Sequence, residues 1–305
     1  MSWETALDNR IHDYLPDLKW AADEPMAKHT SFRIGGPAKR MAFPKTREQL
    51  VVLMGFLQDA GVKPLLIGNG TNLLVADKGL DTVVIDTSAE LSHIELTDEG
   101  EIAADAGVSL AKLALFAWKN GLTGLEFAHG IPGSVGGAVC MNAGAYGGEM
   151  RQVVREATVL FPEEGIRTLT GEELAFSYRH SLLTDRPDAV VLRAVFALEA
   201  GESAAIREKM DELMARRKAS QPLEYPSAGS TFKRPEGYYA AALIDQCGLK
   251  GLTVGGAQVS EKHAGFVINR GGATCADVTG LMAEIQRRVR EQTGVELEPE
   301  VRVIR

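Results

Sequence analysis

Cysteine is scarce in this sequence of 305 residues, which contains only Cys140, Cys247 and Cys275. The three are odd in number, far apart and not arranged as C-x-x-C, so the sequence predicts neither a disulfide framework nor a zinc site. No stretch approaches the roughly 20 apolar residues that a membrane-spanning helix needs. The first residues, MSWETALDNR, also lack the pattern of a signal peptide. We therefore expect a cytoplasmic protein that does not bind a membrane.

Several catalytic signatures are missing as well. The sequence has no G-x-x-x-x-G-K-S/T phosphate loop, no G-x-S-x-G and no H-E-x-x-H. Its six histidines are scattered without the spacing of metal ligands, so we expect no metal site. The formal net charge of -8 disfavours nucleic-acid binding. An anionic ligand therefore has to meet a local cluster of basic residues.

Glycine is abundant in one stretch, residues 129–148, HGIPGSVGGAVCMNAGAYGG. It holds seven of the 32 glycines of the chain. Glycine tolerates positive φ and has no Cβ, so such a backbone can present its N–H groups to a ligand. The alternative interpretation is a series of tight turns.

A second glycine cluster, GNGTNLL at residues 68–74, follows the short apolar run 64–67. It does not fit the dinucleotide fingerprint G-x-G-x-x-G. Leu73 replaces the third glycine, and residues 73–76 form another apolar, strand-like run instead of a helix. The two glycine clusters together predict a site for one large phosphate-bearing ligand that is not bound in the Rossmann manner.

The order of helical and strand-like patterns predicts an α+β protein. Residues 1–24 form an amphipathic segment in which Ile11, Leu15 and Leu18 are spaced for one helical face. The predicted helices are 47–61, 109–120, 204–218, 239–247 and 276–293. The predicted strands include 64–67, 73–76, 156–161, 189–198 and 265–269.

Several segments outside the glycine clusters carry polar side chains suited to a binding site. Arg33 in TSFRIGGPA is either a phosphate contact or a plain surface cation. Ser230 in SAGSTFKRP lies in a turn of small residues beside Lys233 and Arg234, and it is either a turn-former or a functional hydroxyl. A basic run, Arg216 to Lys218, ends the preceding predicted helix.

Taken in order, seven motifs resemble the UDP-N-acetylenolpyruvoylglucosamine reductase family, flavoenzymes of peptidoglycan precursor synthesis. The motifs are TSFRIGGPA, GNGTNLLV, GLEFAHGIPGSVGGAVCMNAGAYGGEM, YRHS, SAGSTFKRP, HAGFVIN and LEPEVR. The match runs from about residue 28 to the end. The short spacing between YRHS and SAGSTF is similar to that of the second type of the enzyme, which lacks an inserted loop that carries a substrate tyrosine.

The resemblance implies an FAD-binding domain of the vanillyl-alcohol-oxidase (PCMH-like) type and a separate α+β substrate-binding domain. The expected FAD-binding subdomains are 1–62 and 63–200, the substrate domain is 201–295, and residues 296–305 return to the active site. The residues expected to bind FAD are Arg33, Gly68, Asn69, Gly70, Thr71, Asn72, Leu73, Gly133, Ser134, Val135, Gly136, Gly137 and Asn142.

In this family NADPH reduces the flavin, which then passes hydride to C3 of the enolpyruvyl group of UDP-N-acetylglucosamine enolpyruvate. The resemblance assigns the proton for C2 to Ser230 and places Arg179 and Glu300 at the substrate carboxylate, with Glu300 acting as a neutral acid or as an orienting group. Expected substrate contacts are Tyr178, Lys218, Lys233, Arg234 and His263. Arg234 and His263 replace residues of the other branch of the family.

Two alternative functions remain at this stage. Another FAD oxidoreductase of the same fold would keep the glycine motifs but would not need SAGSTF or LEPEVR. A non-catalytic protein that binds a nucleotide sugar would carry no flavin. We expect a monomer that binds NADPH and the nucleotide sugar in turn, while the preference for NADPH over NADH stays open.

Overall fold

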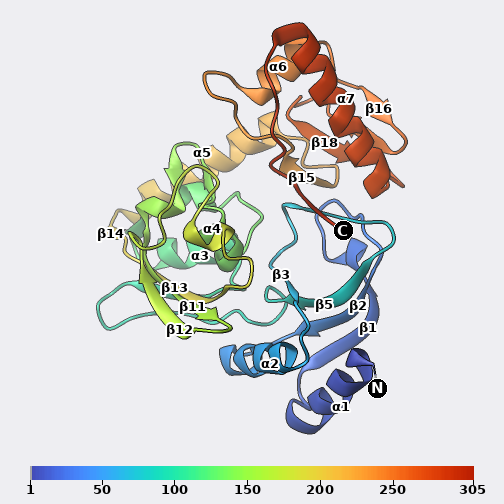
Figure 1. Cartoon of the computed structure of the whole chain (residues 1–305). Coiled ribbons are helices and arrows are strands. Elements are labelled where there is room, and N and C mark those ends of the chain that lie inside the picture. The colour runs from blue at the N-terminus through green and yellow to red at the C-terminus, as the bar shows by residue number, and fades with distance from the viewer. Residues whose placement is uncertain (1) are drawn as a thin grey trace. The chain divides into compact units, whose positions relative to one another are not determined.

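The computed structural model describes residues 2–305, and its elements confirm an α+β protein (Figure 1). The α-helices are α1 (Trp3–Tyr14), α2 (Arg47–Asp59), α3 (Leu110–Lys119), α4 (Val135–Cys140), α5 (Ser203–Ser220), α6 (Ala240–Gln246) and α7 (Cys275–Thr293). The 3-10 helices are η1 (Met26–Lys28), η2 (Glu126–Ala128), η3 (Met150–Gln152) and η4 (Leu182–Thr184).

The strands of the first half are β1 (Lys19–Pro25), β2 (Pro37–Phe43), β3 (Leu65–Ile67), β4 (Leu73–Val75), β5 (Leu80–Asp86), β6 (Ile94–Leu96), β7 (Ile102–Asp105), β8 (Leu122–Thr123), β9 (Gly144–Ala145) and β10 (Gly148–Glu149). Those of the second half are β11 (Val154–Phe161), β12 (Gly165–Thr170), β13 (Val190–Phe196), β14 (Glu199–Ala200), β15 (Ser227–Ser230), β16 (Thr253–Val254), β17 (Ala257–Val259), β18 (Phe266–Asn269) and β19 (Arg302–Ile304).

The chain divides into two compact units that do not follow the predicted domain ranges. The first unit comprises residues up to Ala22, Arg40–Asn69 and Thr82–Ala215. The second unit comprises Asp23–Lys39, Gly70–Asp81 and Arg216–Arg305. Residues 23–39 and 70–81 thus pack with the last third of the chain. The predicted domains were consecutive ranges and do not include this arrangement. The boundary also falls inside the GNGTNLL turn, between Asn69 and Gly70.

One sheet of the chain has the strand order β1-β2-β5-β3, and β3 pairs in parallel with β5. Helices α1 and α2 cover the part of it in the first unit, where apolar side chains such as Leu50 and Ile85 are fully buried (Figure 1). The prediction that Ile11, Leu15 and Leu18 lie on one helical face was partly wrong. The helix ends at Tyr14 and residues 19–25 form a strand, because Pro16 cannot continue a helix.

The second sheet of the first unit is antiparallel with the order β12-β11-β13-β7-β6. One face packs on α3, α4 and part of α5, and the other contributes Leu160 and Leu192 to the core beneath α1 and α2. Helix α3 starts as predicted, because Ser109 Oγ accepts a hydrogen bond from Lys112 N at 3.2 Å.

The second unit contains the antiparallel sheet β15-β18-β17-β16, and α6 and α7 share an apolar core with it (Figure 1). The N-terminus of α7 is held by the Asp77 carboxylate, which accepts hydrogen bonds from Cys275 N at 2.7 Å and Ala276 N at 3.1 Å. A carboxylate is favourable there because helix N-termini leave N–H groups unpaired and carry positive charge. Asp77 thereby ties residues 70–81 to α7. Between residues 2 and 305, no helix combines the length and apolar character needed to cross a membrane.

Asp105 is a buried carboxylate at the end of β7 that stability measurements can detect. Its side chain lies 3.5 Å from Arg47 Nε and accepts a hydrogen bond from His93 N at 3.3 Å. Burial raises the pKa of the Asp105 carboxyl, and Arg47 offsets only part of that effect. Folding then favours the protonated form of Asp105. The free energy of unfolding therefore falls as pH rises from the pKa of the unfolded chain through the higher pKa of the folded protein.

We expect Asp105→Asn to become progressively more stable than the wild type as pH rises from about 4 to 7, measured by urea unfolding. Asp8→Asn is the matched control, and we expect it to become less stable than the wild type as pH rises. Hydrogen bonds from Arg40 lower the pKa of Asp8, so its contribution is present at higher pH and lost as pH falls. A pH profile of Asp105→Asn parallel to that of the wild type would contradict this account.

Candidate active site

The last residues of the chain pair with the segment that follows β15, and this pairing brings Ser230 and Glu300 together within the second unit. Glu300 N donates to Thr231 O at 2.9 Å, and Lys233 N donates to Glu298 O at 2.8 Å. Phe232 and Pro299 form a bridge between these bonds. Ser230, directly before Thr231, is exposed at the end of β15 and Glu300 is half-buried. Two of the three predicted catalytic residues therefore lie on paired segments.

Thr231 connects that pairing to the sheet of the second unit. It is only 1% exposed, and its Oγ1 accepts a hydrogen bond from Val267 N at 2.9 Å. Its N–H donates to Gly265 O at 2.8 Å, while its carbonyl accepts from Glu300 N. The backbone beside Ser230 is thus fixed on both sides. Sequence reasoning did not single out Thr231, because its partners lie far away in the chain.

The second half of the GNGTNLL turn also contacts the Glu300 segment. Asn72 Nδ2 donates to Glu300 O at 3.0 Å, and Arg302 N donates to Asn72 O at 3.0 Å. Residues 73–75 then pair in parallel with residues 302–304. Gly70 has a φ of 60°, and a Cβ there would lie 2.0 Å from His29 O, so glycine is required. Asn72 was predicted to bind FAD, but its amide donates to the protein.

The first half of the same turn lies against the glycine-rich stretch of the first unit. Asn69 Nδ2 donates to Pro132 O at 3.2 Å. A Cβ on Gly68 would lie 2.0 Å from Ser134 Oγ. Ser134 is 2% exposed, and among residues 2–305 no hydrogen-bond partner is found for its Oγ. A buried hydroxyl of this kind usually needs a partner, and a bound ligand can provide one.

The glycine-rich stretch contains helix α4, which the sequence analysis missed. Val135, Ala138 and Val139 form its buried face at helical spacing. A Cβ on Gly136 would lie 3.0 Å from Ala106 Cβ, so this glycine permits close packing. The N–H groups of Val135 and Gly136 donate to Val108 O at 2.9 Å and Ala106 O at 2.8 Å. The expectation that backbone N–H groups serve a ligand therefore does not hold for these two residues.

Arg33 lies in an anchored loop of the second unit. Its φ of 56° is unusual for a residue with a side chain. Its neighbours Phe32 and Ile34 are 1% and 3% exposed, whereas Arg33 itself is exposed. Ser31 Oγ donates to Ser227 O at 2.6 Å, and Asn269 Nδ2 donates to Phe32 O at 3.0 Å. The loop thus holds the backbone of Arg33 in a strained conformation of the type found at functional sites.

Arg179 and Tyr178 belong to the first unit. Arg179 has a φ of 53°, and its guanidinium donates to Gly144 O at 3.3 Å. It also lies 5.1 Å from the centre of the Tyr178 ring, which is 51% exposed. Since Ser230 and Glu300 belong to the second unit, the convergence of all three catalytic candidates stays a prediction.

Asn142, another predicted cofactor residue, is fully buried with 0% exposure. Its Nδ2 donates to Ser177 O at 2.9 Å and to Glu149 Oε2 at 3.1 Å, and its Oδ1 accepts from Arg151 N at 2.9 Å. The side chain therefore ties the YRHS segment to the glycine-rich stretch. This arrangement favours a positioning role for Asn142 over contact with a cofactor.

The predicted substrate contacts of the second unit differ in their surroundings. Lys218 is exposed in the last turn of α5, and its carbonyl accepts a hydrogen bond from Lys262 Nζ at 2.7 Å. Lys233 forms an ion pair with Glu298. The Arg234 guanidinium lies 3.9 Å from the centre of the Tyr239 ring. Lys262 is a further cation beside Lys218 that no sequence motif indicated, because 44 residues separate the two.

His263 packs against the core of the second unit. Its ring lies edge-on to Phe266, with 4.9 Å between the ring centres, and Nδ1 accepts a hydrogen bond from Gly265 N at 3.2 Å. Burial lowers the pKa of His263, and Lys250 lowers it further. The imidazole is therefore neutral at pH 7, so it acts as a hydrogen-bonding group and not as a cation.

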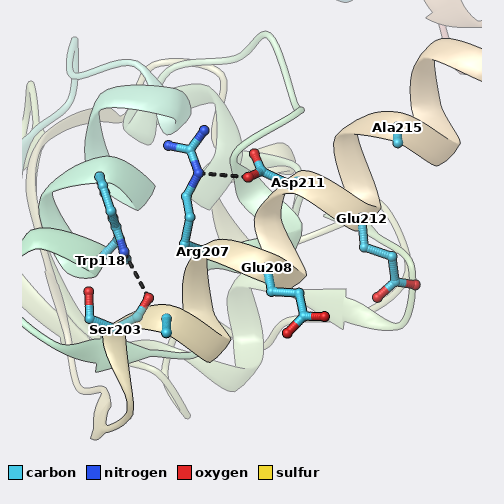
Figure 2. A pocket seen from close by; sticks show the side chains of 8 residues that line it. Trp118, Ser203, Arg207, Glu208, Asp211, Glu212 and Ala215 are labelled. Atoms are coloured by element: carbon cyan, nitrogen blue, oxygen red, sulfur yellow. Dashed lines mark hydrogen bonds and ion pairs between the residues drawn. The ribbon is translucent and has the colours of Figure 1, made fainter.

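A surface hollow of about 870 Å³ on α3 and α5 of the first unit contains none of the predicted site residues (Figure 2). It is lined by Trp118, Ser203, Ala204, Arg207, Glu208, Asp211, Glu212 and Ala215. Trp118 Nε1 donates to Ser203 O at 2.9 Å, and Arg207 Nε donates to Asp211 at 2.9 Å. The first of these bonds joins α3 to α5, and the second lies within α5. In the described part of the chain, no three His, Cys, Asp or Glu side chains gather as a metal site would require.

Two family models match the chain. Residues 38–170 match a model described as FAD binding domain. Residues 221–304 match a model described as UDP-N-acetylenolpyruvoylglucosamine reductase, C-terminal domain. These matches confirm the predicted fold class and FAD as the cofactor.

Curated and solved proteins agree with these models. The chain is 49% identical over 298 residues to UDP-N-acetylenolpyruvoylglucosamine reductase of Caldanaerobacter subterraneus, and the match covers 98% of each chain. It is 49% identical over 289 residues to the enzyme of the same name from Limosilactobacillus reuteri, covering 95% of this chain and 96% of the other. The solved structure of the reductase from Thermus caldophilus matches with a TM-score of 0.80 at 36% identity, covering 94% of this chain and 99% of that one.

We expect Asn142→Ala to lower the free energy of unfolding by about 2–4 kcal/mol, because it leaves several buried polar groups unpaired. Chemical denaturation measures the loss. The matched control is Asn120→Ala, which removes an exposed amide that donates to Phe116 O at 2.8 Å, and we expect it to cost less than about 1 kcal/mol. Equal losses in the two variants would mean that Asn142 does not hold the YRHS segment.

Proposed function

The chain belongs to the UDP-N-acetylenolpyruvoylglucosamine reductase family, and on that basis we propose that it reduces the enolpyruvyl group of UDP-N-acetylglucosamine enolpyruvate to give UDP-N-acetylmuramate, with NADPH as reductant. The observation that carries the proposal is the pairing of the Glu300 segment with the strand end that presents Ser230. The pairing brings together two segments whose residues Ser230 and Glu300 are 70 positions apart in sequence, which supports the proposal.

The residues around the GNGTNLL turn fit a bound FAD. Ser134 offers a buried hydroxyl without a partner among residues 2–305, and Gly68 leaves no room for a side chain beside it. We propose that Gly68, Asn69, Gly70 and Ser134 hold the cofactor, while Val135 and Gly136 support it through the packing of α4. Bound FAD supplies the chemistry of hydride transfer from NADPH to C3 of the enolpyruvyl group.

Ser230 is proposed to donate the proton that C2 receives. The double bond between C2 and C3 then becomes a single bond, with hydride added at C3 and the proton at C2. Serine is a weak acid, so it needs a fixed position and electrostatic help. The fixed backbone at Thr231 provides the position. The Lys233 ammonium is paired with Glu298, so it acts on Ser230 only through its field.

Glu300 and Arg179 are proposed to act on the carboxylate of the substrate. Negative charge builds on that group as hydride adds to C3, and preorganised donors lower the barrier to this step. The guanidinium of Arg179 supplies positive charge and directed N–H groups. Glu300 acts either as a neutral acid that donates to the carboxylate or as a group that orients its other partners.

The basic residues near the end of α5 are proposed to bind the diphosphate of the nucleotide sugar. Lys218 and Lys262 lie together there, and Arg216 and Arg217 belong to the same turn. In a protein with a net charge of -8, such a local cluster is needed to attract an anionic substrate. Tyr178, Arg234 and His263 are proposed as further contacts, with His263 neutral. We further propose that the protein acts in the cytoplasm as a monomer.

An absorption spectrum tests the proposed function directly. The purified protein is expected to show a flavin band that NADPH bleaches under anaerobic conditions and that UDP-N-acetylglucosamine enolpyruvate then restores. UDP-N-acetylglucosamine, which lacks the enolpyruvyl group, is the control ligand. A colourless protein, or a bleached flavin that the substrate does not reoxidise, would rule out the proposed reaction.

Ser134→Ala tests the proposed contact with the cofactor without using activity. Removal of a buried hydroxyl that has no protein partner is expected to leave the apo-protein as stable as before or about 1 kcal/mol more stable. The affinity for FAD is expected to fall about 5- to 10-fold, the value of one ordinary hydrogen bond. FAD titration of the apo-protein and urea unfolding measure the two effects. A destabilised apo-protein with unchanged FAD affinity would show that the hydroxyl serves the fold.

Ser230→Ala separates the two halves of the reaction. The variant is expected to retain flavin reduction by NADPH, while reoxidation by the substrate slows by at least 100-fold because the proton donor is lost. Anaerobic rapid mixing measures each step. Ser227→Ala, three residues earlier on the same strand, is the control and is expected to react like the wild type. Normal reoxidation in Ser230→Ala would assign the proton to another group.

A further inference from the structure

Two asparagines of the GNGTNLL turn, three residues apart, donate to different parts of the protein. Asn69 donates to Pro132 O, at the start of the stretch that contains Ser134. Asn72 donates to Glu300 O, in the segment that carries the predicted catalytic carboxyl. The division of the chain into units falls between them, so each asparagine fixes the turn within its own unit. The two side chains therefore have different tasks, although sequence analysis grouped them as cofactor residues.

The contact of Asn72 with the Glu300 segment involves both its side chain and its backbone. Its Nδ2 lies 3.0 Å from Glu300 O, and its carbonyl accepts a hydrogen bond from Arg302 N at 3.0 Å. The next residues continue this contact as the parallel pair of β4 and β19. The side-chain bond is the one part of this contact that depends on the identity of residue 72.

The two peptide groups that flank the Glu300 side chain are each held by a hydrogen bond, one to Thr231 and the other to Asn72. Glu300 N donates to Thr231 O at 2.9 Å, and Glu300 O accepts from Asn72. Thr231 is itself buried and bonded to β18. The direction in which the Glu300 side chain leaves the backbone is fixed by these two bonds.

We propose that Asn72 is a positioning residue, which holds the backbone of Glu300 so that its carboxyl meets the substrate, and that it is not a ligand of the cofactor. This inference rests on the proposed function, because it requires Glu300 to act on the substrate carboxylate. Catalysis is sensitive to small displacements of a group that stabilises developing charge, and an error of about 1 Å can cost about 100-fold in rate.

Asn72→Asp and Asn72→Ala both remove the donor. Aspartate keeps the shape of asparagine but places a carboxylate oxygen against the carbonyl of Glu300, so the segment is pushed away. Alanine removes the bond without adding charge. The backbone pairing of β4 with β19 does not require the side chain, so the local fold has a second means of support in both variants.

The experiment compares three quantities in each variant: the affinity for FAD, the rate of flavin reduction by NADPH, and the rate of reoxidation by UDP-N-acetylglucosamine enolpyruvate. Both Asn72 variants are expected to slow reoxidation 10- to 100-fold at saturating substrate. Their FAD affinity and NADPH step are expected to stay within about twofold of the wild type, a split that a general loss of structure would not produce.

Two other asparagine variants serve as references. Asn120→Asp removes an exposed hydrogen bond from the side-chain amide to Phe116 O in α3. It is expected to leave all three quantities unchanged. Asn69→Asp removes the bond to Pro132 O and is expected to weaken FAD binding. An Asn72 variant that weakens FAD binding in the same way, with normal reoxidation in the protein that retains flavin, would overturn the proposal.

A double-mutant cycle tests whether Asn72 acts through Glu300. In Glu300→Gln, the further change Asn72→Asp is expected to have less than a threefold effect on reoxidation, because the group that it positions is already altered. If the double variant slows reoxidation by the product of the two single-variant factors, the two residues act independently and the proposal is overturned. Slow reoxidation in Glu300→Gln with normal reoxidation in Asn72→Asp would refute the inference and leave the proposed function intact. A normal rate in Glu300→Gln would remove the role of Glu300 and with it this inference.

Discussion

The backbone pairing between the last residues of the chain and the segment after Ser230 is the constraint on which the site depends. Glu298 and Glu300 are joined to Lys233 and Thr231 by main-chain hydrogen bonds. Without them, the hydroxyl of Ser230 and the carboxyl of Glu300 would belong to unconnected parts of a long sequence. The proposed chemistry therefore depends on a short ladder within the second unit.

Buried side chains on both segments hold this ladder in register. Phe232, Leu297 and Val301 are each less than 5% exposed and belong to the core under α6 and α7. Burial of each of these side chains stabilises the fold by about 2 kcal/mol. A shift of the pairing by one residue would place polar side chains in this core, so the register is strongly specified. Ser230 is exposed and Glu300 is half-buried, and neither belongs to this core.

The structure places strained backbone at several proposed functional residues. Arg33 and Arg179 both have φ values between 50° and 60°, a region that residues with a Cβ rarely occupy. Each lies in a segment anchored by hydrogen bonds between side chains and main-chain carbonyls. At Arg33, the buried neighbours Phe32 and Ile34 offset the cost of this conformation.

The sequence predicted the elements whose signals are local. Helices α2, α3 and α7 have regular apolar spacing and good N-caps, and all were predicted within two residues of their observed ends. The α+β class followed from the order of helical and strand-like patterns, and FAD followed from the family resemblance. Helix α4 was missed because its glycines resemble turn residues. Leu15 and Leu18 were expected to continue the helical face of Ile11 because the stop at Pro16 was overlooked.

Long-range contacts explain what the sequence did not predict in the site. The Asn142 amide reaches a carbonyl 35 residues away, and the Asn72 amide reaches one 228 residues away. No local pattern specifies such partners, and the family resemblance had placed both asparagines among the cofactor residues. Ser230 and Glu300 were identified by family resemblance, and their proximity became evident only from the fold.

Amide hydrogen exchange, followed residue by residue by NMR in the cofactor-free protein, tests the central claim most directly. The account predicts that the amides of Glu300 and Lys233 exchange at least about 100-fold more slowly than in an unfolded chain, because each is hydrogen-bonded in the ladder. Exchange of the Glu300 amide at the unfolded rate would show that the ladder is not formed, and it would contradict the proposed site.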